Sequence, residues 1–409
     1  MTEVVITGMG AVSPHGRSVA ALWSGLLSAK AAFSPLTLFD ASMFRNPLAG
    51  VVHGYSSPDG QDQPARAIQM LLDAAGEALA DGLRLSGPLD PHAVREAIHA
   101  GSLQRAAIVT GSNFGGMSAA EGALVDGASD PGKASLDGYL FGAAGTALKN
   151  RWGLNGPQFN LSLSCASGTA ALGLSLDLIR LGRAEAVLCA GYDELSLFVY
   201  AGLSALRAIT PDTLRPFDKR RKGTLFSEGA GAVLLESLEH ARARNAPHIH
   251  ALLKGRFMNN DAHHMTAPEE HAIGIQAVMR GALLDAAVAP DAIDHLNLHA
   301  TGTPYNDAIE TKAIHAVFGA RGMTIPVASV KSSIGHTMGA AGVLESIAAI
   351  MTLREQTAPP VLGLDLAQQD PACGVNAPTA PLRGEFNTIL KTSYGFGGTN
   401  SAIVLQRAT

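Results

Sequence analysis

The sequence contains an internal repeat, and this repeat limits the chain to a fold built from two similar halves. The segment CASGTAALGLSLDLI, which starts at Cys165, aligns with HTMGAAGVLESIAAI, which starts 171 residues later at His336. The segment FSEGAGAVLLE, from Phe226, aligns at nearly the same offset with FGGTNSAIVLQ, from Phe396. Two matches at nearly one offset indicate a duplication. We therefore expect a pseudo-twofold axis that makes Cys165 and His336 equivalent positions at the starts of two helices.

Strand and helix patterns alternate along both halves, which we place at residues 1–245 and 246–409. Short apolar runs predict buried strands and longer Ala/Leu-rich segments predict helices, an alternation typical of α/β sheets that are covered on both faces. No linker rich in Pro or Ser separates the halves. The predicted strands are residues 4–7, 107–110, 186–190, 232–235, 296–299 and 402–405, and the predicted helices are residues 65–80, 168–181, 273–287 and 342–353.

The composition indicates a large buried core. Only 16% of the 409 residues are charged, against a norm of about 25%. The sequence is too apolar and too weakly charged for a disordered chain. Its net charge of −5 without a basic tail argues against nucleic-acid binding. Residues 152–176 carry no charge and are long enough to cross a bilayer, but their first half is too polar for a lipid-facing helix. We expect a buried strand, turn and helix there, and no membrane span.

The cysteine content and the N-terminal segment both favour a cytoplasmic location. Three cysteines are too few for a disulfide framework, which indicates a reducing compartment. The first residues, MTEVVITGMG, lack the basic and apolar regions of a signal peptide.

Cys165 lies in LSLSCASGTAAL, where a strand-like run ends and a helix of small residues begins. A thiol at a helix N-terminus experiences the positive end of the helix dipole and free backbone N–H groups, which favours the nucleophilic thiolate. The alternative is an inert buried thiol, the interpretation that we give to Cys189 and Cys373. Cys165 is therefore the candidate nucleophile.

Two of the 14 histidines occupy unusual positions. His299 ends a predicted strand in LNLHATGTP, and His336 ends KSSIGH at the start of a Gly/Ala-rich helix. Neither has metal-ligand spacing to another His or Cys, so we predict no metal site. Lys331 precedes His336 by five residues and needs an acidic partner if it is buried, for which Glu345 is the candidate.

The C-terminal glycine cluster GFGGTN follows a strand but does not match the spacing of nucleotide-binding loops. It is typical of a tight turn with exposed backbone N–H groups, which would suit an oxyanion hole.

In combination, these motifs resemble the β-ketoacyl-acyl carrier protein synthases, condensing enzymes of the thiolase superfamily. The resemblance runs from VVITGMGAVSPHG to GFGGTNSAIVL and includes the cysteine turn, RPFD with EGAGAVLLE, HATGTP, KSSIGH and GFGGTN. It is strongest to the elongating branch with a Cys-His-His site, which also contains the ketosynthases of polyketide pathways. It implies a thiolase-like, five-layered αβαβα fold built from the two duplicated halves.

The resemblance also implies a role for each matching residue. Cys165 would accept an acyl group from a carrier thioester, and His299 and His336 would polarise the malonyl thioester while CO₂ leaves. The product would be a 3-oxoacyl-acyl carrier protein. Substrates would be carried on phosphopantetheine, with no metal or redox cofactor. The amides of Cys165 and Phe396 would form an oxyanion hole, and Phe396 would also gate the acyl pocket. Lys331, held by Glu345, would tune the electrostatics of the site. Substrate would bind to Thr301, Thr303, Gly397 and Gly398.

Two features depart from the family pattern. Ala300 stands where the family usually has a glycine after its first catalytic histidine, which tightens the backbone near the pantetheine arm. The basic surface that would bind an acidic carrier protein is also thin. Its candidate residues are Arg66, Arg207, Lys219 and Arg220, and the run DKRRKG is equally well explained as a solvated loop.

Phe114 lies in GSNFGG, where many relatives have a smaller aliphatic residue that lines the acyl pocket. Ordinary core packing is one interpretation. The other is that its ring shortens the pocket and restricts the length of the acyl chain.

Three functions remain open at this point. The leading one is decarboxylative condensation in fatty-acid or polyketide biosynthesis. A non-elongating subunit of a ketosynthase heterodimer would lack the nucleophile, whereas Cys165 is present. A hydrolase or acyltransferase could use the same acyl-cysteine. We expect acyl carrier protein as the partner, and a homodimer, with a heterodimer of two ketosynthase-like chains left open.

Overall fold

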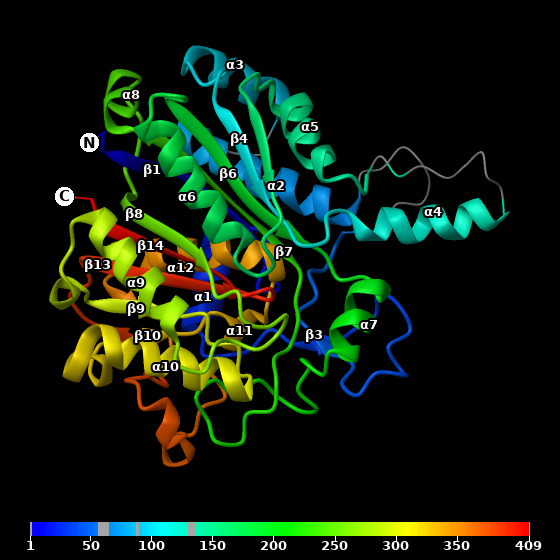
Figure 1. Cartoon of the computed structure of the whole chain (residues 1–409). Helices are drawn as coiled ribbons and strands as arrows, with labels where there is room; N and C mark the ends of the chain where they lie inside the picture. Colours follow the sequence, from blue (N-terminus) through cyan, green and yellow to red (C-terminus); the bar gives the residue numbers. More distant parts are fainter. Residues whose placement is uncertain (1, 56–64, 87–89, 130–135, 137, 409) are drawn as a thin grey trace.

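The computed structural model describes residues 2–55, 65–86, 90–129, 136 and 138–408 of the chain (Figure 1). Within these residues, ten strands form one mixed sheet, five from each half. The strands of the N-terminal half are β1 (Val4–Val12), β4 (Ala107–Gly111), β5 (Gln158–Leu161), β6 (Ala186–Asp193) and β7 (Gly229–Ser237). Those of the C-terminal half are β8 (Ala251–Asn260), β9 (His295–Asn297), β10 (Val327–Ala328), β13 (Thr388–Gly395) and β14 (Thr399–Arg407).

Both halves have the same strand order. The sheet runs β10-β9-β13-β14-β8-β1-β7-β6-β4-β5, so each half reads 3-2-4-5-1 from its outer edge when its strands are numbered in chain order. The three outer strands of each half pair in parallel, and the inner ones pair antiparallel. β1 and β8 join the halves through an antiparallel pairing. The duplication seen in the sequence is therefore also present in the topology.

Helices form three layers around the two half-sheets, as Figure 1 shows. The outer face of the N-terminal half is covered by α2 (Arg66–Leu83), α3 (Pro91–Ala100) and α5 (Phe141–Trp152). The outer face of the C-terminal half is covered by α9 (Ile273–Ala286) and α10 (Pro304–Phe318). Between the half-sheets lie α6 (Ser167–Arg180) and α12 (Ala341–Glu355). The five layers that the resemblance implied are thus α, β, α, β and α in this order.

The remaining elements connect or flank these layers. They are α1 (Val19–Leu27), α4 (Met117–Ser129), α7 (Leu197–Ala205), α8 (Leu238–Ala243), α11 (Lys331–Ile334), the 3₁₀ helices η2 (Pro290–Ala292), η3 (Gly319–Met323), η4 (Met338–Ala340), η5 (Leu366–Gln368) and η6 (Pro371–Cys373), and the short strands β2 (Ser34–Pro35), β3 (Leu48–Ala49), β11 (Thr357–Ala358) and β12 (Leu382–Arg383).

The two central helices approach closely because glycines lie at their contact. A Cβ atom on Gly168 of α6 would lie 2.7 Å from the carbonyl oxygen of Gly339. A Cβ atom on Gly342 of α12 would lie 2.2 Å from the nitrogen of Thr169. Real side chains do not fit at such distances, so larger residues at either position would push the layers apart.

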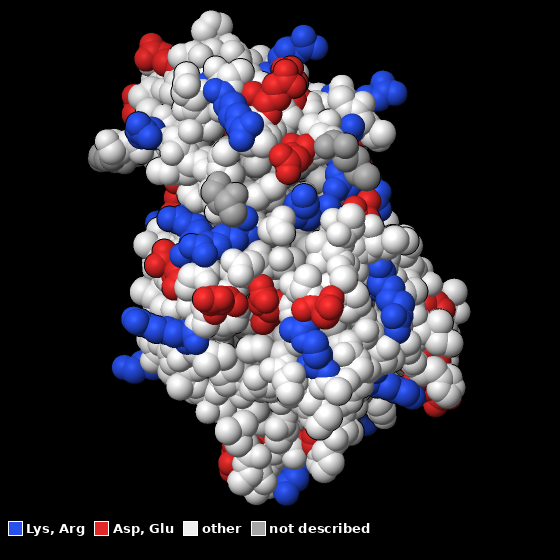
Figure 2. Space-filling model, turned by 90° about the vertical axis from the view of Figure 1, so that its left-hand side faces the viewer, with Lys and Arg blue, Asp and Glu red and all other residues white. Residues whose placement is uncertain are grey.

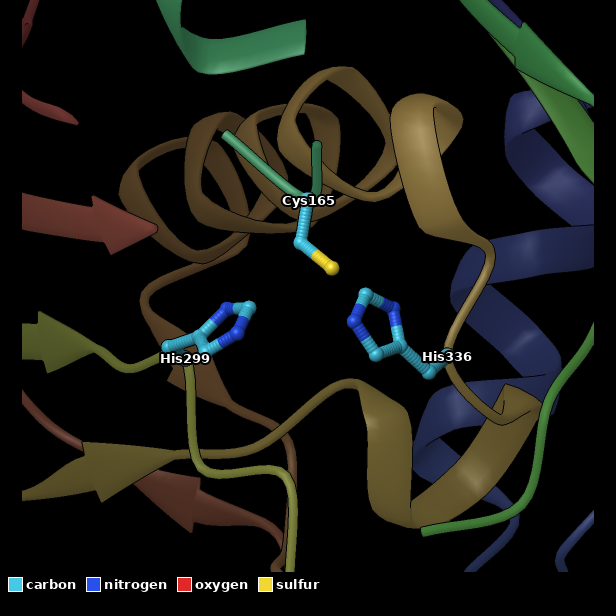
Figure 3. Close-up of side chains that lie close together, drawn as sticks. All are labelled: Cys165, His299 and His336. Carbon is cyan, nitrogen blue, oxygen red and sulfur yellow. The ribbon is translucent and has the colours of Figure 1, made fainter. Parts of the chain in front are cut away.

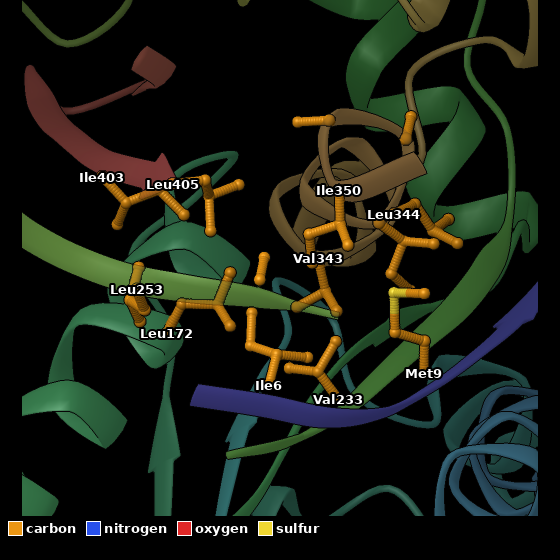
Figure 4. Close-up of a cluster of buried hydrophobic side chains, with 14 of the residues drawn as sticks. Ile6, Met9, Leu172, Val233, Leu253, Val343, Leu344, Ile350, Ile403 and Leu405 are labelled. Carbon is orange, nitrogen blue, oxygen red and sulfur yellow. The ribbon is translucent and has the colours of Figure 1, made fainter. Parts of the chain in front are cut away.

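The main hydrophobic core surrounds these central helices. Ile6 of β1, Val343 of α12 and Leu405 of β14 are buried in one cluster that receives side chains from both half-sheets (Figure 4). Residues 341–353 are all buried, which explains the low charge of the chain. The uncharged stretch 152–176 comprises the end of α5, β5 and most of α6. Among the described residues, no helix combines the length and the hydrophobicity needed to cross a bilayer.

All ten predicted segments contain an element of the predicted type, although their bounds differ by a few residues. The strand predicted over 296–299 ends at Asn297, so His299 lies in the loop that follows β9. The strands β8 and β13 were not predicted because Lys254, Arg256 and Lys391 interrupt their apolar pattern.

His295 of β9 is a buried histidine remote from any predicted site, and it makes stability depend on pH. Neither ring nitrogen has a hydrogen-bond partner among the described residues, and the ring packs edge-on against Phe386. Burial lowers the pKa of His295 to about 3 from the usual 6.5. Below about pH 6.5 the unfolded chain therefore binds a proton that the folded chain does not. Each pH unit of acidification then costs about 1.4 kcal/mol of stability.

We expect a His295→Leu variant to lose this acid sensitivity. Urea unfolding at pH 7 and pH 5 should show that the wild type loses about 2 kcal/mol more of its unfolding free energy than the variant does. Equal losses in both proteins would contradict this account of His295.

Candidate active site

Cys165 lies on a tight turn between β5 and α6. Ser164, immediately before it, has a φ of +51° in the left-handed region, and the Ser167 hydroxyl donates a hydrogen bond to the Ser164 carbonyl at 2.6 Å. Gly395 packs against this turn, because a Cβ atom there would lie 2.9 Å from the carbonyl oxygen of Leu163. The turn holds the cysteine at the N-terminal end of a central helix and directs its side chain toward the C-terminal half (Figure 3).

The structure brings Cys165 together with His299 and His336, as Figure 3 shows. The Cys165 sulfur and one nitrogen of each imidazole lie within 4.8 Å of one another. The centroids of the two imidazole rings are 5.4 Å apart, and the ring planes are nearly perpendicular. His336 precedes η4 and α12, as Cys165 precedes α6, so the predicted equivalence of their positions is visible at the ends of the two central helices.

Hydrogen bonds determine which nitrogen of each imidazole carries the proton. The Met338 amide donates to Nδ1 of His336 at 3.2 Å. The Lys331 ammonium lies 3.2 Å from Nδ1 of His299, and an ammonium can only donate. Burial, with the Lys331 charge as the next cause, lowers the pKa of both histidines well below 6.5. Both rings are therefore neutral and carry their proton on Nε2.

This tautomer suits donation to an oxyanion better than metal binding. The three donor atoms are close enough to be considered as ligands. A metal at Nε2, however, would require a ring whose Nδ1 already accepts a hydrogen bond to give up its only proton. Nε2 of His336 is buried and has no partner among the described residues, so it is free to donate to a bound molecule.

Burial of Cys165 acts against the thiolate form that the helix N-terminus favours. Burial raises the pKa of the Cys165 thiol to about 11, although the Lys331 charge opposes this shift. Desolvation of the sulfur therefore outweighs the helix dipole. The thiol keeps its proton at neutral pH and must transfer it during nucleophilic attack.

A buried charge network lies behind the histidines. Lys331 forms the predicted ion pair with Glu345 of α12. The other carboxylate oxygen of Glu345 lies 2.8 Å from the ammonium of Lys391 on β13. Sequence reasoning missed Lys391, and its signal was a lysine within the otherwise apolar run TILKTSYG.

Glu310 and Ala300 position the backbone next to His299. The Glu310 carboxylate accepts hydrogen bonds from the amides of His299, at 2.9 Å, and of Ala300, at 2.8 Å. Ala300 has a φ of +34°, in the region that favours glycine. The protein therefore holds the methyl group of Ala300 in this backbone region at some conformational cost.

Asp193, at the end of β6, is a second buried carboxylate that the sequence analysis did not identify. It accepts hydrogen bonds from the Ser112 hydroxyl at 2.7 Å and from the amides of Phe114 and Gly339. It therefore joins the loop after β4 to the start of η4, just behind His336. The signal in the sequence was an acidic pair at the end of the apolar strand AVLCAGYDE.

Cys165, His299 and His336 line a cavity of about 540 Å³. The other predicted residues that line it are Phe114, Arg207, Thr301, Thr303, Phe396 and Gly398. The hydroxyls of Thr301 and Thr303 lie 3.0 Å apart, and the side chain of Phe396 is partly exposed at the cavity.

The amides of the glycine turn are less available than predicted. The Gly397 amide donates to the carbonyl of Met265 at 2.7 Å, and the Gly398 amide donates to the carbonyl of Gly395 at 3.1 Å. Both amides shape the turn, so the expectation of exposed backbone N–H groups does not hold for them, whereas the substrate-binding role of Gly397 and Gly398 stays a prediction. The turn nevertheless places Phe396 at the cavity, beside Cys165.

The prediction that Arg66 is a docking residue was also wrong. Its side chain is buried and forms an ion pair with Glu228 at 2.5 Å, because the first turn of α2 faces inward. Lys219 and Arg220 are exposed, although the guanidinium of Arg220 is paired with Asp218. Arg207 is exposed and lines the cavity.

Charges of both signs are interspersed on the face of the molecule that Figure 2 shows. Lys and Arg side chains lie beside Asp and Glu over much of this face, as the modest net charge of −5 suggests. This distribution differs from the continuous basic stripe of a nucleic-acid-binding protein.

Comparison with known proteins extends over the whole chain. Residues 1–241 match the family model "Beta-ketoacyl synthase, N-terminal domain", and residues 250–365 match "Beta-ketoacyl synthase, C-terminal domain". The 3-oxoacyl-[acyl-carrier-protein] synthase 2 of Coxiella burnetii is 34% identical over 99% of this chain and 98% of its own.

Solved ketosynthase structures are similar in fold. The ishigamide ketosynthase/chain length factor aligns over the full length of both chains, with a TM-score of 0.88 and 31% identity. A type II PKS ketosynthase from the AntDE:AntF complex with its acyl-carrier protein also aligns over both full lengths, with a TM-score of 0.88 and 28% identity. Since both halves match the two domains of one family, in the order and with the topology of that family, this chain is a condensing enzyme that belongs to the β-ketoacyl synthases.

Proposed function

We propose that this chain condenses a cysteine-bound acyl group with malonyl-acyl carrier protein, giving 3-oxoacyl-acyl carrier protein and CO₂. The observation that carries this proposal is the convergence of the Cys165 thiol with two neutral imidazoles, those of His299 and His336, whose Nε2 atoms carry protons. A nucleophile beside two hydrogen-bond donors suits thioester chemistry in which negative charge develops on oxygen.

In the first half-reaction, the Cys165 sulfur attacks the carbonyl carbon of an acyl thioester. The bond from that carbon to the carrier sulfur breaks, and the thiol proton leaves with the carrier thiol. We assign the oxyanion hole for this step to the backbone amides of Cys165 and Phe396, which the packing of Gly395 brings together.

In the second half-reaction, the malonyl group loses CO₂. The bond between its carboxyl carbon and its α-carbon breaks, and the electron pair forms an enolate whose oxygen accepts the Nε2–H groups of His299 and His336. The α-carbon then attacks the acyl-cysteine carbonyl. Cys165 leaves as a thiolate and regains a proton from water.

The carrier protein would approach the mouth of the cavity. The AntDE:AntF structure contains an acyl-carrier protein bound to its ketosynthase. In this chain, Thr301 and Thr303 would bind the pantetheine arm, while Arg207, Lys219 and Arg220 would face the acidic carrier. Phosphopantetheine, as part of the substrate, is the prosthetic group that this proposal requires.

We also propose that the protein forms a homodimer and is located in the cytoplasm. β5 is an edge strand, and large apolar side chains are exposed on it and on α4 and α7, namely Phe159, Leu124 and Phe198. Exposed edges and apolar side chains of this kind favour a subunit interface. The three cysteines are free, which suits a reducing compartment. The mass of the purified protein in solution, measured by light scattering, tests the oligomeric state.

Incubation with acyl-acyl carrier protein and malonyl-acyl carrier protein tests the reaction. We expect a 3-oxoacyl product and release of CO₂. Free fatty acid in place of that product would instead indicate a hydrolase, and the absence of an acyl-enzyme in mass spectra would indicate a non-elongating subunit.

Phe114 provides a prediction about chain length. It lines the cavity, and its amide is fixed by Asp193 at 3.0 Å, so its ring is attached to a rigid loop. We expect Phe114→Ala to extend the pocket and to shift the products toward longer acyl chains. Product lengths from wild type and variant, compared by mass spectrometry, check this expectation, and an unchanged distribution would contradict it.

A further inference from the structure

Lys391 is a fully buried lysine directly behind the candidate active site. Its ammonium lies 2.8 Å from the second carboxylate oxygen of Glu345 and donates to the Thr392 carbonyl at 2.8 Å and to the Ser393 hydroxyl. The Ser393 hydroxyl lies 2.9 Å from the hydroxyl of Thr169 on α6. Lys391 thus connects α12 with the helix that begins beside Cys165.

The network holds two ammonium groups around one carboxylate. Among the described residues, Glu345 is the ion-pair partner of both Lys331 and Lys391. Glu310 lies nearby, but its carboxylate is occupied by the amides of His299 and Ala300 and by the Thr392 hydroxyl, at 2.9 Å. Glu345 is therefore the carboxylate that both ammonium groups share by ion pairing.

We propose that Lys391 is a positioning residue for decarboxylation, which binds one oxygen of Glu345 and thereby keeps Lys331 directed at Nδ1 of His299. The proposal rests on the roles proposed above for Lys331 and His299. Without Lys391, both oxygens of Glu345 would be available to Lys331. Lys331 could then turn toward the carboxylate and release Nδ1 of His299, whose bond to Lys331 fixes the Nε2–H tautomer.

Because Lys391 can lose its proton, its proposed role should make the rate of decarboxylation depend on pH. Burial lowers the pKa of Lys391 to about 8, with the Lys331 charge acting in the same direction and Glu345 opposing it. The titratable groups that interact with it are Glu345 on α12, Lys331 on α11, Glu310 on α10, His299 after β9 and His336 before η4. Above about pH 8, Lys391 would lose the positive charge that pairs with Glu345, so decarboxylation should slow there in the wild type.

A Lys391→Met variant tests the proposal through the two half-reactions. We expect transfer of an acyl group to Cys165 to stay within about threefold of wild type, because the amides and the thiol are unchanged. We expect decarboxylation of malonyl-acyl carrier protein by the acylated enzyme to fall about 10- to 100-fold, because a small misplacement of a reacting group can cost about 100-fold. The decline above pH 8 should disappear. Lys254→Met, a partly exposed lysine on β8, is the matched control and should behave as wild type.

A second variant distinguishes loss of the ammonium group from misfolding of the protein. Lys391→Ala should show the same defect, and millimolar propylammonium, which can occupy the vacated space, should restore part of the decarboxylation rate. Wild-type decarboxylation in both variants, or an equal loss of both half-reactions without rescue, would overturn the proposal. His299→Ala, measured in parallel, distinguishes a failure of the proposed active site from a failure of the role proposed for Lys391. If it retains decarboxylation, the proposed site is wrong, whereas if only the Lys391 variants retain it, the role of Lys391 alone is wrong.

Discussion

A Cys165→Ala variant is expected to form no acyl-enzyme and to lose condensation by about 10⁴-fold or more. Removal of the nucleophile abolishes the covalent intermediate, and such losses are among the largest seen in enzymes. The side chain ends in the cavity, so its truncation should change the unfolding free energy little. The measurements are mass spectrometry of the enzyme after incubation with acyl-acyl carrier protein, and the rate of formation of the 3-oxoacyl product.

Cys189 provides the matched control for this experiment. It is buried in β6, away from the cavity, and burial raises the pKa of its thiol to about 12. A Cys189→Ala variant should retain the acyl-enzyme and most of the activity. If Cys165→Ala still formed a covalent acyl-enzyme, or if Cys189→Ala abolished it, the assignment of the nucleophile would be wrong.

Replacement of His336 by alanine should lower the rate of decarboxylation about 10²- to 10³-fold. This is the usual effect of removing one preorganised donor from an oxyanion site. The Nε2–H group of His336 is buried, has no partner in the described part of the chain and lies beside Cys165, so its bonding capacity is available to the enolate. The measurement is CO₂ release from malonyl-acyl carrier protein by the acylated enzyme at saturating substrate, so that the change appears in kcat.

The matched control for His336 is His295, another buried neutral histidine. His295→Leu should retain wild-type decarboxylation at pH 7.5, because His295 does not line the cavity. A His336→Ala enzyme with unchanged kcat would remove His336 from the proposed mechanism. An equal loss of decarboxylation in the His295 variant would indicate that altered packing, and not the missing donor, lowers the rate in His336→Ala.

The sequence predicted most of the site because its motifs are local. Cys165 at its turn, and His336 at the start of the next central helix, depend on neighbouring residues and on the repeat. His299 was recognised from HATGTP, although the strand before it ends two residues earlier than expected. These features require particular residues at fixed spacing, and fixed spacing can be read from one chain.

The errors concern burial, which depends on residues distant in the sequence. Arg66 was expected at the surface beside a polar segment. In the structure it forms an ion pair in the interior with Glu228, which is 162 residues away in the sequence. Lys391 was not identified from the sequence, and the structure shows its ammonium paired with Glu345 and close to the Lys331 charge. The helix N-terminus favours the Cys165 thiolate, but the surrounding protein removes the water that would stabilise it, an effect that the local sequence does not show.

By itself, the sequence determined that this protein has two duplicated halves, a low charge suited to buried central helices, and a Cys-His-His set of a condensing enzyme. Tertiary structure alone decided that the three side chains converge, that both imidazoles are neutral and carry Nε2 protons, and that two lysines share one glutamate behind them. The physical reason is that residue type and local spacing are encoded along the chain. Protonation states and charge pairing depend instead on desolvation and on distances that exist only once the two halves have packed together.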